Sequence, residues 1–94
     1  GGKNIIFTYY ILTCEKRTLA KLKAIDELIV SLKNPNPIVR QQAAWALGNI
    51  MDIKVVPPLI KALEDRDKEV RKEARESLIK LSSESSEIKS MLPF

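Results

Sequence analysis

A repeat with a period of 31 residues constrains the fold more than any other feature of this chain. Five positions of one segment recur in identical or similar form in a second: Val39, Arg40, Ala43, Leu47 and Ile50 correspond to Val70, Arg71, Ala74, Leu78 and Leu81. Three apolar positions upstream recur as well, with Leu28, Ile29 and Leu32 matching Leu59, Ile60 and Leu63. This period is typical of repeat proteins, in which each unit buries its apolar face against its neighbours.

The spacing within residues 38–50 predicts an amphipathic helix with two distinct faces. One stripe is expected to be buried: Val39, Ala43, Ala46, Leu47 and Ile50. A second stripe lies on another side of the helix and is mostly polar around one large aromatic residue: Ile38, Gln41, Gln42, Trp45 and Asn49. We expect the first stripe to pack inside the protein and the second to face outward.

Turn signals predict a further helix before residues 38–50 and another before the equivalent segment of the second repeat. An apolar pattern with helical spacing ends at Asn34-Pro35-Asn36-Pro37, because a residue that precedes proline avoids the α region. The segment Glu64-Asp65-Arg66-Asp67 stands at the equivalent place in the second repeat. Each repeat is therefore predicted to be a pair of helices.

Three stretches resemble HEAT repeats, specifically the short type also found in phycobilin lyase subunits. They are Pro-Pro-Leu-Ile-Lys-Ala-Leu-Glu-Asp at 57–65, Val-Arg at 70 and 71, and Ala-Ala-Trp-Ala-Leu-Gly-Asn-Ile at 43–50. The resemblance covers roughly residues 24–81 and implies an all-α fold, an α-α superhelix of two stacked helix pairs. The chain departs from the family pattern at Glu27, at Asn34 in place of Asp, at Arg75 and Ser77 in place of small alanines, and at Ile79 in place of Gly.

We expect four segments: an apolar and basic N-terminal cap at 1–17, HEAT-like repeats at 18–50 and 52–81, and a polar linker with a C-terminal tail at 82–94. Propensity favours a strand for residues 5–14, whereas the repeat period favours a helix that caps the array, which we prefer. Pairing of this segment with a second copy is the alternative. Two repeats are fewer than the three or so usually needed for stability, so the chain is expected to belong to a longer array or to form a homodimer through residues 5–12 and 91–94.

The composition argues against catalysis. The chain has no histidine and one cysteine, so neither a usual zinc site nor a Ser-His-Asp or Cys-His arrangement can be built. Acidic pairs such as Asp65 with Asp67 fit a solvated surface better than acid-base chemistry. We therefore expect no enzyme activity, no cofactor, no metal and no small-molecule substrate. The single Cys14 suits a reducing compartment, and a cytoplasmic location is expected.

The positive charge is concentrated near the N-terminus. The net charge is +4, and residues 1–24 hold five basic residues against one acidic residue, while the remainder is balanced. The outward stripe of the second repeat is mixed in charge: Glu69, Lys72, Glu73, Glu76 and Lys80. Nucleic acid is therefore an unlikely partner for that stripe, because phosphates require clustered positive charge. The apolar run near the N-terminus, about ten residues long, is too short to span a bilayer.

These observations predict a non-catalytic scaffold that binds a protein partner. The resemblance places the partner on the face of the second helices, presented by Ile38, Gln41, Gln42, Trp45, Asn49, Lys72, Glu76 and Lys80. It also implies that Arg40, Asp65 and Arg71 form a structural ladder between repeats. Two alternatives remain open: an accessory subunit of a tetrapyrrole (bilin) lyase or similar enzyme, and a nucleic-acid or membrane-surface module that uses the basic N-terminal end.

Overall fold

The protein is a stack of helices. The computed structural model describes the backbone of residues 2–94 and the side chains of residues 16–94. The helices are α1 (Gly2–Ser31), α2 (Pro37–Leu47), α3 (Val56–Ala62), α4 (Lys68–Glu84) and α5 (Ser86–Met91), with a 3-10 turn, η1 (Ile53–Val55), before α3. No strand occurs in the described backbone. The all-α prediction is confirmed.

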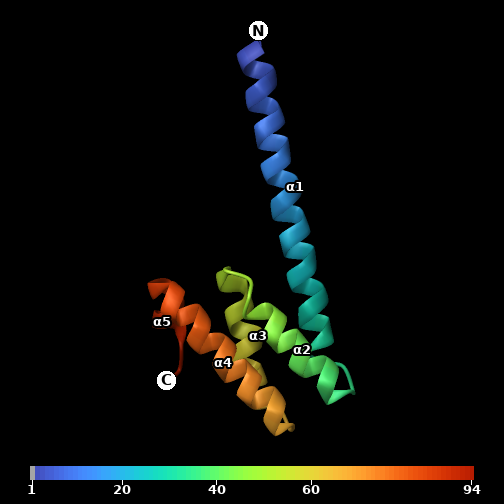
Figure 1. Cartoon of the computed structure of the whole chain (residues 1–94), viewed down its shortest axis with the longest axis vertical. Helices are drawn as coiled ribbons and strands as arrows, with labels where there is room; N and C mark the ends of the chain where they lie inside the picture. Colours follow the sequence, from blue (N-terminus) through green and yellow to red (C-terminus); the bar gives the residue numbers. More distant parts are fainter. Residues whose placement is uncertain (1) are drawn as a thin grey trace.

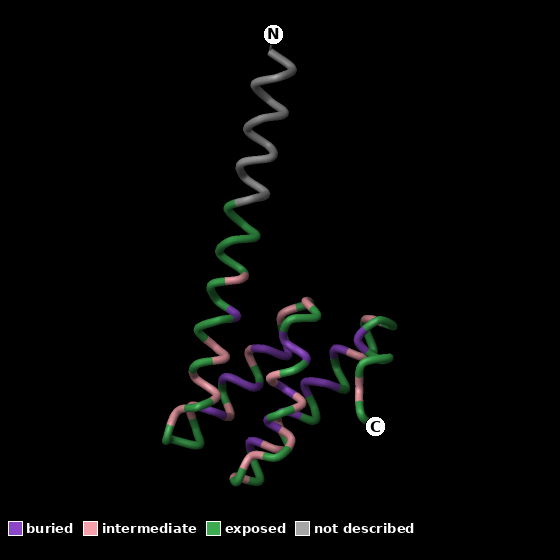
Figure 2. Tube along the Cα trace, turned by 180° about the vertical axis from the view of Figure 1, so that it is seen from behind, coloured by how far each residue is buried: buried purple, intermediate pink, exposed green. Residues whose placement is uncertain are grey.

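Two helix pairs pack side by side, as the repeat predicts. α1 contacts α2, α3 contacts α4, and the pairs meet mainly where α2 lies against α4 (Figure 1). The buried residues follow the inner sides of α2, α3 and α4, and the core includes Ile25, Leu47, Leu59, Leu78 and Leu81 (Figure 2). The core is therefore continuous across the two pairs, and neither pair buries its apolar face alone.

Equivalent side chains start the second helix of each pair. The Asn36 side chain accepts a hydrogen bond from the Ile38 N–H at 2.9 Å, and Pro37 takes the first helical position, where its missing N–H costs nothing. Asp67 stands 31 residues later and accepts from the N–H groups of Glu69 and Val70. Equivalent positions of the two repeats therefore cap their helices with the same kind of hydrogen bond.

We expect a boundary between residues 17 and 18, but α1 continues through this point without a break. The backbone of residues 5–14 is helical, in agreement with the preferred prediction over a strand. The predicted capping contacts of these residues lie outside the described side chains. Between residue 16 and Ile25, α1 is almost wholly exposed, and Ile25 is the first buried residue described.

The C-terminal segment 82–94, which we expect to be a polar linker with a tail, is largely helical. α4 extends to Glu84 and α5 follows after one residue. The serines support helical turns locally: the Ser82 hydroxyl donates to the Ile79 carbonyl at 2.8 Å, and the Ser85 hydroxyl accepts from the Ile88 N–H at 3.3 Å as a helix cap. Ile88 is 1% exposed, so burial of one apolar side chain anchors α5.

α2 and α4 approach each other closely at Gly48. Ser77 of α4 is 5% exposed, and its hydroxyl donates to the Ala44 carbonyl at 2.9 Å. A Cβ atom added at Gly48 would lie 2.3 Å from the Ser77 Oγ and 2.5 Å from its Cβ, which is closer than atoms can pack. The absence of a side chain at Gly48 therefore sets the spacing of the two helix pairs.

Candidate partner-binding face

α2 and α4 present one continuous face, which we call the α2/α4 face. It is formed by the predicted partner-binding residues Ile38, Gln41, Gln42, Trp45, Asn49, Lys72, Glu76 and Lys80. All of them are exposed except Gln41, which is partly buried. Trp45 is 60% exposed and Ile38 is 61% exposed, so two large apolar side chains on α2 are open to solvent. α2 and α4 lie next to each other, and four of these residues, Trp45, Asn49, Glu76 and Lys80, line one hollow between them.

Trp45 stands between two hollows. The first, the α1/α2 hollow, encloses about 530 Å³ and is mainly apolar, with Leu28 and Ser31 of α1 facing Val39, Gln42, Ala43, Trp45 and Ala46 of α2. The second, the α2/α4 hollow, is lined mostly by polar residues: Trp45, Gly48, Asn49, Glu73, Glu76, Ser77 and Lys80. A ligand that covers the indole ring would therefore meet apolar surface on one side and charged groups on the other.

Polar contacts hold the centre of this face in place. The Asn49 amide donates to the Trp45 carbonyl at 3.0 Å, which fixes the amide group beside the indole. The Lys80 ammonium donates to the Asn49 Oδ1, linking α2 to α4 across the hollow. Asn49 and Lys80 occupy equivalent places 31 residues apart, so the contact joins the same position of two successive repeats.

Arg40 joins the two repeats beneath the turns. Its Nε donates to Asp65 Oδ2 at 3.0 Å and its Nη2 to Asp65 Oδ1 at 3.2 Å, which makes a two-point contact with the carboxylate. Its Nη1 donates to the carbonyl groups of Asn34 and Pro35. Arg40 is 4% exposed, so the guanidinium is buried with its charge and donors satisfied. The contact is structural and leaves no free cation at this position.

The Asp65 carboxylate is held in its ionised form. Burial raises the pKa of Asp65, but the hydrogen bond from the Asp67 N–H and the contact with Arg40 outweigh it, and the net pKa lies below the ordinary 3.8. Arg71 is placed differently from Arg40, because it donates to the Asp65 carbonyl rather than to its side chain. The three residues of the predicted ladder therefore meet at one turn.

A second acidic residue ties α1 to the loop before α3. Asp52 Oδ1 accepts from the Lys54 N–H at 2.8 Å, and Asp52 Oδ2 lies 3.2 Å from the Lys21 Nζ. The pKa of Asp52 is lowered, first by the Lys54 N–H and then by Lys21, against an opposing effect of burial. Lys21 is 46% exposed, so this ion pair is screened and contributes little to stability.

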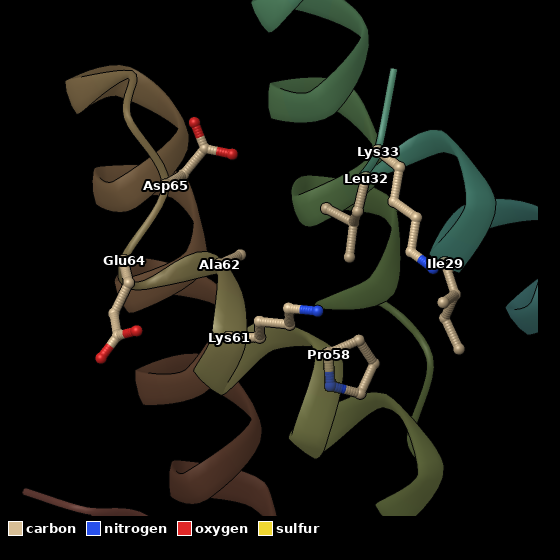
Figure 3. A pocket seen from close by; sticks show the side chains of 8 residues that line it. All are labelled: Ile29, Leu32, Lys33, Pro58, Lys61, Ala62, Glu64 and Asp65. Atoms are coloured by element: carbon tan, nitrogen blue, oxygen red, sulfur yellow. The ribbon is translucent and has the colours of Figure 1, made fainter. Parts of the chain in front are cut away.

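Another hollow opens on the opposite pair of helices, between the end of α1 and α3. It encloses about 300 Å³, and its apolar wall is formed by Ile29, Leu32, Pro58 and Ala62. Lys61 extends across it toward Leu32 and Pro58, whereas Glu64 points away (Figure 3). Asp65 also borders this hollow, but its carboxylate is occupied by Arg40. Nothing in this arrangement joins it to the α2/α4 face.

Comparison with known proteins gives one match. A family model described as HEAT repeats matches residues 14–88. The chain belongs to the HEAT repeat family. In the comparison with curated proteins, nothing matches the chain. The family match extends the predicted resemblance, residues 24–81, further along α1 to residue 14 and into α5 to residue 88. The phycobilin-lyase detail stays a prediction.

HEAT repeats are generally protein-interaction scaffolds and are typically not enzymes. Among the described side chains, no three or more of His, Cys, Asp and Glu are grouped to hold a metal ion. No described helix combines the length and apolar character needed to cross a membrane.

Sequence reasoning missed several residues that shape the face. Ala44 is fully buried although it lies outside the predicted apolar stripe, and Val39, Ala46 and Ile50 of that stripe are only partly buried. Ser77 was treated as a departure from the family, yet it is a buried hydrogen-bond donor against α2. Gly48 and the small residue Ser77 together indicate a close approach of two helices. The sequence does not show that these two residues face each other, so this signal could be interpreted only once the structure was known.

Proposed function

We propose that this HEAT repeat chain is a non-catalytic scaffold that binds a protein partner on the α2/α4 face. The observation that carries the proposal is Trp45, which is 60% exposed at the centre of that face with a hollow on each side. A solvent-exposed indole is costly to leave in water and valuable when covered, since tryptophan is enriched among the residues that dominate binding energy.

The charges around Trp45 favour a protein over a nucleic acid. Lys72 and Lys80 share the face with Glu69, Glu73 and Glu76, so both signs are interspersed. Phosphate groups would be repelled by the three carboxylates, whereas a protein surface with mixed polar groups can match both signs. The Lys80 contact with Asn49 adds a fixed polar edge that supplies orientation.

The two hollows favour a partner segment that carries two kinds of side chain. The α1/α2 hollow beside Trp45 suits an apolar side chain, because Leu28, Val39 and Ala43 line it. The α2/α4 hollow suits a polar or charged group, because Glu73, Glu76 and Lys80 line it. A segment that carries an apolar anchor next to polar residues satisfies both hollows at once, and the indole lies between them as the central contact.

The experiment compares the wild-type chain with Trp45→Ala, immobilised and exposed to the same cell extract, with bound proteins quantified by mass spectrometry. Trp45→Ala is expected to lose the specific proteins, because truncation of a central tryptophan costs on the order of 2 kcal/mol or more of binding free energy. Val30→Ala removes an apolar side chain that is 69% exposed on α1, and serves as the control that retains them.

Trp45 fluorescence supplies an independent readout. In the free chain, emission is expected at long wavelength and acrylamide should quench it readily, because most of the side chain is in water. Addition of a protein recovered from the extract should shift emission to shorter wavelength and reduce quenching. Equal recovery of the same proteins by wild type and Trp45→Ala, or emission unaltered by a bound protein, would refute the assignment of this face.

A further inference from the structure

Arg71, the arginine of the second repeat that contacts the preceding turn, indicates a second binding surface. Arg71 repeats the pose of Arg40: the Arg40 Nη1 donates to the Asn34 carbonyl at 2.8 Å, and the Arg71 Nη1 donates to the Asp65 carbonyl at 2.7 Å. In both cases the acceptor lies six residues before the arginine. The equivalent backbone oxygen of each turn therefore positions the guanidinium group that follows it.

The two arginines differ in what their remaining donors contact. The Nε and Nη2 of Arg40 hold the Asp65 carboxylate, which comes from the following repeat. Within residues 16–94, no acceptor is assigned to the Nε or Nη2 of Arg71. Since a guanidinium presents these two donors as a planar fork that matches a carboxylate, Arg71 offers the geometry that Arg40 uses, without an occupant in the described chain.

Other cations and one apolar residue surround this fork. Lys68, Arg71, Arg75 and Ile79 follow one another at helical spacing along the side of α4 that faces away from α2, and we call this the α4 end face. Lys68 and Arg75 are exposed, and Ile79 is 51% exposed. The acidic residues of α4 lie on the α2/α4 face instead, so the α4 end face is positive.

The α4 end face is not shaped for another helix at the spacing between α2 and α4. Arg75 and Ile79 stand 31 residues after Ala44 and Gly48, the two small residues that allow α4 to approach α2. Large side chains at both places would hold a neighbouring helix further away. The occupant must therefore reach the Arg71 fork with a side chain or a loop, while Ile79 provides an apolar contact beside it.

We propose that the α4 end face binds an acidic segment of a partner protein, with one carboxylate in the Arg71 fork, a second near Arg75 and an apolar side chain against Ile79. The internal contact between Arg40 and Asp65 argues for a carboxylate, because the identical fork in this protein holds a carboxylate. This surface lies on another side of α4 from the α2/α4 face, so the proposal does not depend on the role of Trp45.

The test uses a fluorescein-labelled peptide, Gly-Asp-Leu-Asp-Asp-Leu-Gly, and measures fluorescence anisotropy as the chain is added. Arg71→Lys keeps the charge and removes the two-point fork, and we expect roughly tenfold weaker binding. Arg75→Gln should also weaken binding several-fold. Lys61→Gln makes the same change of charge on α3 and should leave binding unaltered, as should Trp45→Ala on the other face.

Two further probes decide between occupants. The peptide with Asn in place of Asp should bind far more weakly, and a single-stranded oligonucleotide of equal charge should compete poorly. If Arg71→Lys disturbs folding, Arg75→Glu is tested instead, with a peptide in which one Asp is replaced by Lys. The reversed charges on the chain and on the peptide should then attract each other and restore binding. Equal binding by wild type, Arg71→Lys and Arg75→Gln overturns the proposal. Tighter binding of the oligonucleotide than of the peptide also overturns the proposal. Self-association of the chain in sedimentation that Arg75→Gln abolishes would overturn it too, because the occupant would then be a second copy of the chain.

Discussion

Replacing Gly48 by Ala tests the close approach of α2 and α4. Gly48 has a right-handed helical backbone, with φ −67° and ψ −12°, so alanine meets no backbone strain there. Local propensity alone would favour the substitution by about 0.5–1 kcal/mol. The expected result is nevertheless destabilisation, because the new Cβ would lie 2.3 Å from the Ser77 Oγ and 3.0 Å from the Ser77 Cα.

The magnitude follows from what must move. Ser77 is buried and its hydroxyl is engaged with the Ala44 carbonyl, so the side chain cannot rotate away without losing that hydrogen bond. Overpacking in a tight core costs about 1–3 kcal/mol, and the buried Ser77 hydroxyl left without a partner adds about 1 kcal/mol, whereas the Ala44 carbonyl still accepts from the Gly48 N–H. After subtraction of the propensity gain, we expect a loss of about 2 kcal/mol, or a decrease in melting temperature of about 8–16 °C for a domain of this size.

The assay is equilibrium urea unfolding combined with thermal unfolding followed by circular dichroism. Ser77→Gly removes the Oγ and Cβ that the new methyl group would strike, so the free-energy changes of Gly48→Ala and Ser77→Gly should not add. We expect the double variant to be more stable than their sum by about 1 kcal/mol or more. A neutral or stabilising Gly48→Ala would refute the packing argument, and strict additivity would refute its assignment to Ser77.

Two further predictions concern the contact between Arg40 and Asp65. Arg40→Met leaves the partly buried Asp65 carboxylate without its cation, and we expect a loss of about 3 kcal/mol in urea unfolding. Asp65→Leu should recover part of this loss because it removes the orphaned charge, and a loss below about 1 kcal/mol would contradict the prediction. The second prediction is a dependence of stability on pH. The pKa of Asp65 in the folded chain lies below its ordinary value of 3.8. The ionised carboxylate therefore stabilises the fold fully above pH 3.8, and this stabilisation is lost as the pH falls through the lower pKa of the folded chain. Stability of the wild type should therefore decline below about pH 3.8, and Asp65→Asn should show a shallower decline in the same titration; parallel curves would rule out Asp65 as a contributor.

Much of the fold was predictable because its signals are local or periodic. The apolar spacing of residues 38–50 and its recurrence after 31 residues predicted the two helix pairs, and helical geometry alone placed Trp45 on the exposed side. Asn36 and Asp67 cap the helices that follow them, and a cap is a local signal because it acts within two or three residues. The predicted meeting of Arg40 with Asp65 came from the family resemblance, and the structure gives its geometry.

Other features depended on which elements face each other. The serines near residue 82 resemble a linker by composition, yet they continue α4 because burial of Ile88 secures the turns that follow. The depth of the α1/α2 hollow depends on how the end of α1 lies beside Trp45, and no pattern within α2 contains that information. The basic residues of α4 fall into two groups: Lys80 lines the α2/α4 hollow with Glu73 and Glu76, whereas Lys68, Arg71 and Arg75 lie on the α4 end face.

The sequence by itself determined the number of repeats, the helical class of the chain and the side of α2 on which Trp45 lies, because each of these follows from periodicity along one chain segment. Only the tertiary structure decided how closely the repeats approach and which acceptors the arginines contact. Gly48 became a spacer when Ser77 was placed opposite it, and Arg40 holds the Asp65 carboxylate whereas Arg71 contacts the Asp65 carbonyl. Distances between helices arise from packing of side chains that are far apart in sequence, and periodicity along one helix does not encode them.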